Sequence, residues 1–159
     1  MLDTRLTEDQ QSLRKTVEAF AREVVAPVSY EHDRAKTFPY GVVAQMAEMG
    51  LFGLPFPEEL GGGGGDPVDA AILTEEVLLG GGSGGVVASL FTHGIAAPHM
   101  ARSGSAHLVD TYVRPALRGE LIGALAVTEP GGGSDVAGLR TRAVLDGELL
   151  VRGVAQGAE

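Results

Sequence analysis

Apolar positions recur at the spacing of an α-helix near the start of the chain. Beyond Thr7 they fall three or four residues apart on one stripe, formed by Leu13, Val17, Phe20, Val24 and Val28. The order Thr7-Glu8-Asp9-Gln10 has the spacing of a capping box, in which the threonine accepts a backbone hydrogen bond and the glutamine reaches back to the cap. We therefore expect a first helix that starts at Thr7 and that Pro27 ends or bends.

Two more helices are framed by their start and stop residues. Pro39 and Gly50 bound a second helix, and the pair Asp66-Pro67 and Gly80 bound a third. The residues expected to face inward from these helices are Val43, Met46, Ala47, Ile72, Leu73, Val77 and Leu78.

The pattern changes near residue 119. Before it, residues 86–91 predict a fourth helix, and a fifth starts at Ser105 and closes at Pro115. After it, residues 122–128 form a short apolar run, and residues 140–152 form two more around Asp146-Gly147, a hairpin turn signal. We expect a mainly α fold, with a helical domain over residues 1–119 and an incomplete β domain over residues 120–159, because one hairpin needs more strands for stability.

Composition excludes several classes of function. The 159 residues carry a formal net charge of −9, which repels nucleic acid and anionic lipid surfaces. Cysteine is absent, so disulfides, thiolate metal sites and cysteine nucleophiles are excluded. Charges through the first 30 residues break any secretory signal, and no apolar run is long enough for a membrane span. These features predict a cytoplasmic protein.

The stretch at residues 125–135, LAVTEPGGGSD, is the strongest candidate for chemistry. In such a stretch, a strand is followed by a threonine, a rigid turn and three glycines. Its backbone can contact a flat ligand directly, because no side chain intervenes. Main-chain N–H groups and the Thr128 hydroxyl match the acceptors on the pyrimidine edge of a flavin ring. Ser134 could donate to a phosphate or to a pantetheine arm, and Asp135 could brace the loop by accepting nearby amides. The alternative is a plain strand exit with a flexible loop.

The string IGALAVTEPGGGSDVAGLRT, residues 122–141, resembles the flavin-binding signature of acyl-CoA dehydrogenases. Upstream segments are similar to the same family in order and spacing, among them GLFG at 50–53 and PEELGG at 57–62. The resemblance implies a helical domain followed by a small β-barrel, of which this chain holds the first strands. It also implies FAD as the cofactor, with cofactor-binding residues Leu125, Ala126, Val127, Thr128, Gly133 and Ser134, and with Ser134 also near the acyl-CoA substrate.

The family reaction, which the resemblance implies, takes a proton from the carbon α to the thioester and a hydride from the β carbon. It further implies fatty acid metabolism, an electron-transferring flavoprotein as electron acceptor, and a homo-oligomer. After Gly153 the sequence departs from the family, and the family's glutamate base lies in a later helical bundle, so no catalytic residue is assigned. We expect these residues alone to be inactive. The alternatives are a fragment of an acyl-CoA oxidase or flavin monooxygenase, or a noncatalytic helical subunit that binds a partner.

Several rival signals have plainer interpretations. Residues 81–85 fit both the G-x-S-x-G and, with Gly80, the G-x-G-x-x-G pattern, but a helix precedes them where each motif needs a strand, so a helix connection is favoured. The glycine tract at 61–65 is expected to be a relaxed, flexible connection.

The polar residues also have plain interpretations. The four histidines lack metal-ligand spacing, so no metal is expected. The side chains of Glu75 and Glu76 point in different directions from one helix, so we expect them to lie on a solvent-exposed face rather than to share an acid–base site. Phe91-Thr92 could border an acyl cavity by family analogy, with core packing as the alternative.

Overall fold

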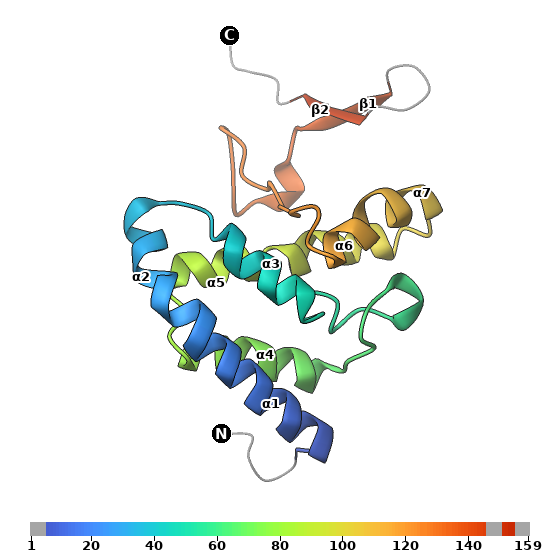
Figure 1. Ribbon diagram of the computed structural model, residues 1–159. Coiled ribbons are helices and arrows are strands. Elements are labelled where there is room, and N and C mark those ends of the chain that lie inside the picture. The colour runs from blue at the N-terminus through green and yellow to red at the C-terminus, as the bar shows by residue number, and fades with distance from the viewer. Residues whose placement is uncertain (1–5, 146–150, 155–159) are drawn as a thin grey trace. The chain divides into compact units, whose positions relative to one another are not determined.

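The computed structural model describes residues 6–145 and 151–154, with side chains described as far as Thr141. These residues are mainly helical, as predicted, and the chain divides into two compact units, Met1–Ala124 and Leu125–Glu159 (Figure 1). Within the described ranges, no helix has both the length and the apolar character needed to cross a bilayer.

The first unit begins with a long helical rod made of α1 (Glu8–Phe20), the π-helix η1 (Ala21–Val25) and α2 (Ala26–Ala35). The predicted capping box is confirmed, because Thr7 Oγ1 accepts from the Gln10 N–H at 3.2 Å and Gln10 Oε1 accepts from the Thr7 N–H at 3.2 Å. Pro27 does not end the rod. It lies directly after the π-helix η1, within the continuous rod, and the rod ends instead at Lys36 with φ 53°.

The π-helix changes which side chains of this rod face inward. Val17 and Phe20 are buried as predicted, but farther along Val25 and Ser29 are buried, whereas Val24 and Val28 are half-buried. A π-helical turn accommodates one extra residue, so the inward stripe moves forward by one position. The predicted stripe is therefore right before residue 21 and displaced by one residue after it.

The next helices follow their predicted start and stop signals. Helix α3 (Tyr40–Glu48) has Pro39 at its N-cap, and Gly50 beyond it takes φ 71°. The 3-10 turn η2 (Glu58–Leu60) and α4 (Pro67–Leu79) come next, and the Asp66 carboxylate caps α4 by accepting the N–H of Val68 at 2.7 Å and of Asp69 at 3.0 Å.

The last helices of the unit differ in part from the prediction. Helix α5 (Gly84–Phe91) is confirmed, but it is followed at once by α6 (His93–Ala101), which the apolar pattern did not indicate. The helix starting at Ser105 comprises α7 (Ala106–Leu108), the π-helix η3 (Val109–Val113) and α8 (Arg114–Leu117). Pro115 does not close the helix; it lies in α8, just after the π-helix η3.

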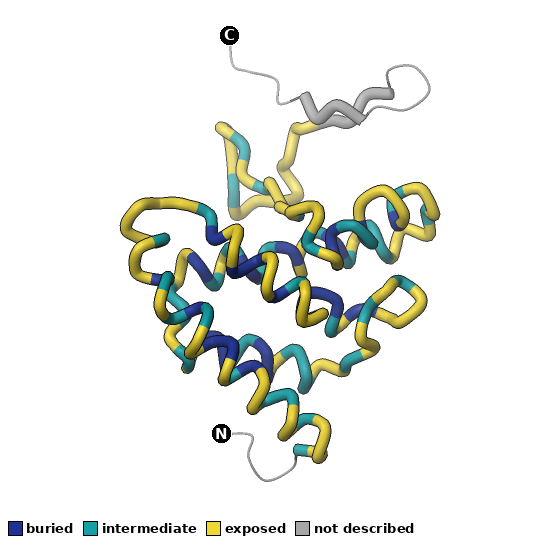
Figure 2. The backbone as a smooth tube through the Cα atoms, in the orientation of Figure 1, coloured by how far each residue is buried: buried dark blue, intermediate teal, exposed yellow. Residues whose placement is uncertain are grey.

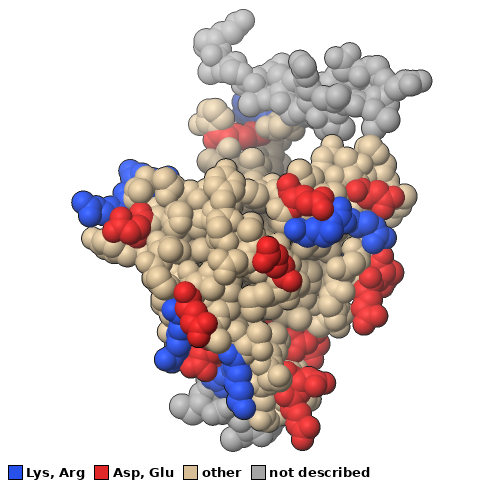
Figure 3. Space-filling view, viewed as in Figure 1, with Lys and Arg blue, Asp and Glu red and all other residues tan. Residues whose placement is uncertain are grey.

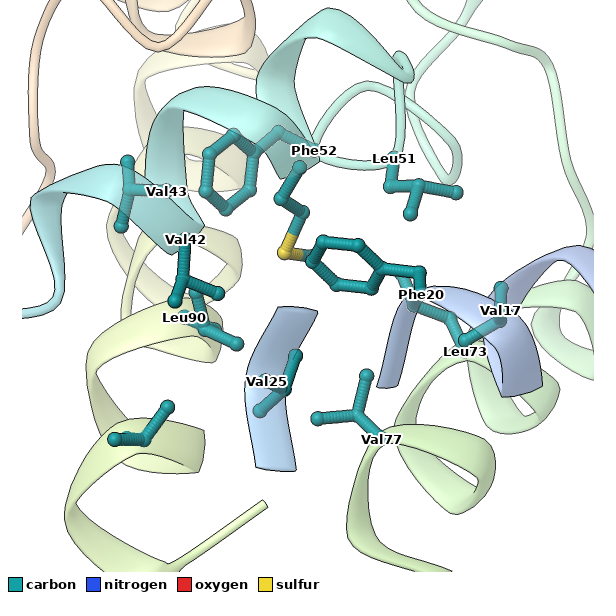
Figure 4. Packing of buried hydrophobic residues seen from close by; sticks show 12 residues of the cluster. Val17, Phe20, Val25, Val42, Val43, Leu51, Phe52, Leu73, Val77 and Leu90 are labelled. Atoms are coloured by element: carbon teal, nitrogen blue, oxygen red, sulfur yellow. The ribbon is translucent and has the colours of Figure 1, made fainter. Parts of the chain in front are cut away.

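Two clusters of buried apolar side chains hold this unit together. The larger cluster joins the rod to α3, α4 and α5, and Figure 4 shows side chains from these segments, among them Phe20, Phe52 and Leu73, gathered between the helices. The smaller cluster contains Phe56, Ala97, Val113 and Leu117. The buried positions in Figure 2 accordingly lie on the inner faces of the helices. Leu78, predicted to face inward, is half exposed.

The connection between α4 and α5 packs directly against the rod. A Cβ on Gly80 would clash with Ala21 Cβ, and a Cβ on Gly81 would lie 2.9 Å from Ala26 Cβ. The Ser29 hydroxyl also accepts from the Ser83 N–H at 3.3 Å. The predicted helix connection is thus confirmed over residues 80–83, where Gly80 and Gly81 permit close packing against the rod, and Gly84 and Gly85 begin α5.

The glycine tract at 61–65 is not a relaxed linker, contrary to the prediction. Its N–H groups bond to the preceding loop, with Gly63 donating to Gly53 O at 2.9 Å and Gly64 to Phe56 O at 2.8 Å. A Cβ on Gly62 would collide with the backbone of Phe56. The tract lacks side chains because two stretches of backbone lie against each other there.

The second unit contains a short 3-10 turn, η4 (Val136–Gly138), and an antiparallel pair, β1 (Arg142–Leu145) and β2 (Val151–Val154). Leu145 pairs with Val151, as a hairpin requires, whereas the predicted turn at Asp146-Gly147 lies outside the described residues. The run at 122–128, predicted as a strand, belongs to no strand of the described structure, because no neighbouring backbone there pairs with it.

A partly buried ion pair joins α1 to α4. Arg14 Nε lies 2.6 Å from Glu76 Oε1, and the Glu76 side chain is only 7% exposed. The predicted solvated face is therefore wrong for Glu76, because the carboxylate is covered by the opposite helix. Most other charges lie on the surface, where Figure 3 shows acidic and basic side chains side by side.

Replacing Arg14 by methionine leaves the Glu76 carboxylate buried without this partner. We expect Arg14→Met to lower the free energy of unfolding by about 3 kcal/mol, because an uncompensated buried charge is costly. Chemical denaturation, monitored by far-ultraviolet circular dichroism, measures the free energy of unfolding. Arg22→Met on the same rod is the control, because its pair with Glu18 is exposed and contributes about 0.5 kcal/mol. Equal losses in the two variants would contradict the structural role of the Arg14–Glu76 pair.

Candidate functional site

The stretch at 125–135 folds into a tight turn. The Glu129 N–H donates to Gly132 O at 2.9 Å and the Gly132 N–H donates to Glu129 O at 3.2 Å, so Pro130 and Gly131 form its tip. This pairing brings the next residues outward, Thr128 and Gly133, opposite each other. A Cβ on Gly133 would lie 3.8 Å from Thr128 Cγ2.

The six predicted cofactor-binding residues all lie along this turn and the run before it. Leu125, Ala126, Thr128 and Ser134 are exposed, and Val127 and Gly133 are half-buried. The turn juxtaposes Thr128 and Gly133, and Ser134 is the residue after them, whereas Leu125, Ala126 and Val127 continue as an extended run. Among the described residues, the structure records no hydrogen bond to the N–H groups of residues 125–128.

The glycines of this turn are not required by the fold of the unit. Cβ atoms placed on Gly131 or Gly132 would meet nothing within 4 Å, and neither residue takes a positive φ. Their absence of side chains therefore relieves no contact with the described protein. The lack of side chains leaves one edge of the turn's backbone accessible to a ligand or another part of the protein.

The Glu129 side chain reaches across the loop that follows the turn. Its carboxylate accepts from the Arg140 N–H at 2.9 and 3.1 Å and from the Thr141 N–H at 2.6 Å. Hydrogen bonds from the Thr141 side chain and from the backbone N–H groups of Arg140 and Thr141 lower the pKa of Glu129. The sequence did not indicate this contact, because its donors lie 11 and 12 residues away along the chain and include main-chain N–H groups, which no residue type marks.

Asp135 braces the same loop, as predicted. Its carboxylate accepts from the Gly138 N–H at 3.2 Å and so caps η4. Glu129 and Asp135 therefore each tie one side of the loop to backbone N–H groups. The turn is held by hydrogen bonds within the second unit.

A separate cavity of about 760 Å³ lies within the helical unit. Its walls are mostly apolar and come from α3, α4, α5, α6 and the loop before η2; they include Met46, Phe52, Leu73, Phe91 and Ile95. Phe91, named from the sequence as a possible border of such a space, lines it. Thr92 is not part of the lining, and its hydroxyl donates to Ala88 O at 2.5 Å.

A buried histidine forms part of the cavity wall. His93 is 5% exposed, its ring stacks on Phe52 with centroids 5.0 Å apart, and Nε2 has no hydrogen-bond partner among the described residues. Burial lowers the pKa of His93, because the charged imidazolium would lose its hydration. The neutral form of the side chain is therefore favoured, and the charged residues of the cavity lining are Glu59 and Arg102.

The rival motifs carry no site. Ser83 follows a helix rather than a strand, and its hydroxyl donates to Ser29 O at 3.3 Å, so it is a packing residue and not a nucleophile at an elbow. Across the described residues, no three histidine, aspartate or glutamate side chains gather as metal ligands would. These findings leave the turn and the cavity as the candidates.

The helical unit matches a known domain. A family model described as "Acyl-CoA dehydrogenase, N-terminal domain" covers residues 7–120. The chain belongs to the acyl-CoA dehydrogenase family. The family resemblance inferred from the sequence is therefore confirmed.

Individual acyl-CoA dehydrogenases and their relatives agree with this assignment. Benzylmalonyl-CoA dehydrogenase of Aromatoleum aromaticum is 34% identical over 96% of this chain, which spans 40% of that protein. A crystal structure described as an acyl-CoA dehydrogenase of Mycobacterium smegmatis is 57% identical, with a TM-score of 0.84 over 89% of this chain and 37% of that one. The FAD complex of PigA is 27% identical, with a TM-score of 0.79 over 89% of this chain and 37% of that one. The chain thus spans about 40% of the length of the curated relatives it matches.

The buried histidine makes stability depend on pH. The pKa of His93 is lowered in the folded state, so below its ordinary value of 6.5 the unfolded chain binds a proton that the folded chain resists. We expect the free energy of unfolding to fall as pH drops from 7.5 to about 5.5. His93→Leu should flatten that dependence, as measured by urea denaturation across the range. His99→Leu, at an exposed position of the same helix, is the control, and parallel pH curves for wild type and His93→Leu would contradict the prediction.

Proposed function

We propose that the chain is part of an FAD-dependent dehydrogenase of acyl-CoA thioesters and that the turn at 125–134 holds its flavin. The observation that supports the proposal most directly is the open backbone edge of this turn. Gly131 and Gly132 relieve no contact with the described protein, and residues 125–128 carry N–H groups without a recorded partner there. A flat ligand with acceptors along one edge would use both features.

The donors available on the turn fit a flavin. Thr128 offers a hydroxyl and an N–H, Ala126 and Val127 offer N–H groups, and Ser134 offers a second hydroxyl just beyond Gly133. The pyrimidine edge of flavin carries carbonyl and nitrogen acceptors that such donors satisfy. FAD, when bound, would supply the oxidant that accepts a hydride from the substrate. The residues of the turn would bind and orient it, and Ser134 would also lie near the acyl-CoA.

The cavity of the helical unit suits the acyl chain of the substrate. Its volume of about 760 Å³ lies within the usual range for small-molecule sites, and its apolar walls favour a hydrocarbon. Burial of each methylene there would contribute about 0.8 kcal/mol. Phe91 and Ile95 would contact the chain from α5 and α6.

The complete enzyme would pass its electrons to an electron-transferring flavoprotein and act as a homo-oligomer in the cytoplasm. The relatives named above are about two and a half times as long as this chain. The family resemblance implies that the glutamate base lies in a later helical bundle. We therefore expect these 159 residues alone to bind FAD but not to oxidise an acyl-CoA with a dye acceptor. Turnover by the purified chain would contradict that expectation, and oxygen consumption would favour an oxidase or monooxygenase.

Removing one donor tests the flavin site. Thr128→Val keeps the shape of the side chain but deletes the hydroxyl, so we expect FAD to bind about tenfold more weakly. Titration of flavin fluorescence against the purified chain gives the dissociation constant. Thr111→Val on η3 is the matched control and should bind as wild type does. Equal affinities of Thr128→Val and wild type, or no flavin binding by wild type, would reject the site.

Filling the cavity tests the acyl site. Ala70 lines the cavity, and Ala70→Phe should exclude at least two methylenes, which weakens the binding of a long-chain acyl-CoA about tenfold. Isothermal titration calorimetry measures the change. Ala106→Phe, at an exposed position away from the cavity, is the control. Unchanged affinity in Ala70→Phe would place the acyl chain elsewhere.

A further inference from the structure

Glu129 connects the turn to the segment that leads into β1. Its backbone forms one half of the pair with Gly132 that closes the turn. Its carboxylate extends to residues 140 and 141, at the start of the segment that leads into β1. One residue therefore connects the turn to the chain that returns beside it.

We propose that Glu129 is a positioning residue that holds Thr128 and Gly133 in the arrangement that receives the flavin. This inference rests on the proposed flavin site. The pair between Glu129 and Gly132 sets Thr128 opposite Gly133, and the carboxylate prevents residues 129 and 140 from separating. The role is distinct from catalysis, because the Glu129 carboxylate is already engaged by N–H donors.

The chemistry of the contact favours a carboxylate over its neutral analogue. Both oxygens of Glu129 accept, with Oε1 bonded to the N–H groups of Arg140 and Thr141 and Oε2 bonded to that of Arg140. Bonds from N–H donors to a charged acceptor are stronger than neutral ones. A glutamine has one accepting oxygen, and its NH₂ group would face an N–H donor. Glu129→Gln therefore keeps the size of the side chain but loses part of the hydrogen bonding to Arg140 and Thr141.

The place of Glu129 in the second unit separates a positioning role from a role in overall stability. The buried clusters of the protein lie in the helical unit, so loss of the Glu129 contact should leave the unfolding midpoint of that unit unchanged. The effect should appear instead in the local protection of Arg140 and Thr141 and in the bound flavin. These readouts differ from those of a residue that serves only the fold.

The experiment compares wild type, Glu129→Gln and Glu120→Gln in the full chain. Glu120 is an exposed glutamate paired with Arg118 in the helical unit, so its variant is the control. In Glu129→Gln we expect faster amide exchange at Arg140 and Thr141, FAD binding weakened about tenfold, and an altered circular dichroism of the bound flavin. Glu120→Gln should match wild type in all three measurements.

The possible results distinguish the role of Glu129 from the flavin site on which it rests. Unchanged amide exchange in Glu129→Gln, or FAD affinity and flavin circular dichroism equal to wild type, would overturn the role of Glu129 while leaving the flavin site intact. A wild-type chain that binds no FAD would reject the flavin site itself, and the role of Glu129 with it. A fall in the unfolding midpoint of the helical unit would show a structural residue rather than a positioning one.

Discussion

The helical unit depends on a close approach between the long rod at residues 8–35 and the connection between α4 and α5. Gly80 and Gly81 lie against Ala21 and Ala26, and any side chain on these glycines would push the two segments apart. Close contact there lets α4 lie along α1 and α5 along α2, which encloses Phe20, Val25 and the rest of the larger core. Small residues on both sides of one contact thus determine how the surrounding helices pack.

Local signals explain why most helices could be predicted. Capping residues, prolines in first turns and glycines after last turns act within a few residues, and those at Thr7, Asp66 and Gly50 behave as expected. The π-helix at Ala21–Val25 has no such signal, because the extra residue is accommodated where the rod meets the glycine connection. A continuous 3.6-residue period therefore assigned the wrong valines to the core beyond it.

The candidate site was predictable in its position but not in its internal contacts. The glycines and Thr128 marked the turn, because their residue types are unusual together. The three backbone hydrogen bonds to the Glu129 carboxylate come from N–H groups, which every residue except proline carries, so the types of residues 140 and 141 did not mark them as its partners. Glu76 illustrates the same limit, because its ion pair joins residues 62 positions apart.

The glycine tract at 61–65 also has a consequence for the cavity. Pro57, Glu59 and Leu60 line the cavity, and hydrogen bonds between residues 53–57 and 61–65 enclose them in a network of backbone. This part of the wall is consequently ordered before any ligand arrives, although only one short turn of regular structure supports it. A ligand would then bind more tightly than it would to a disordered loop, because the conformational entropy of this segment is already lost when the protein folds.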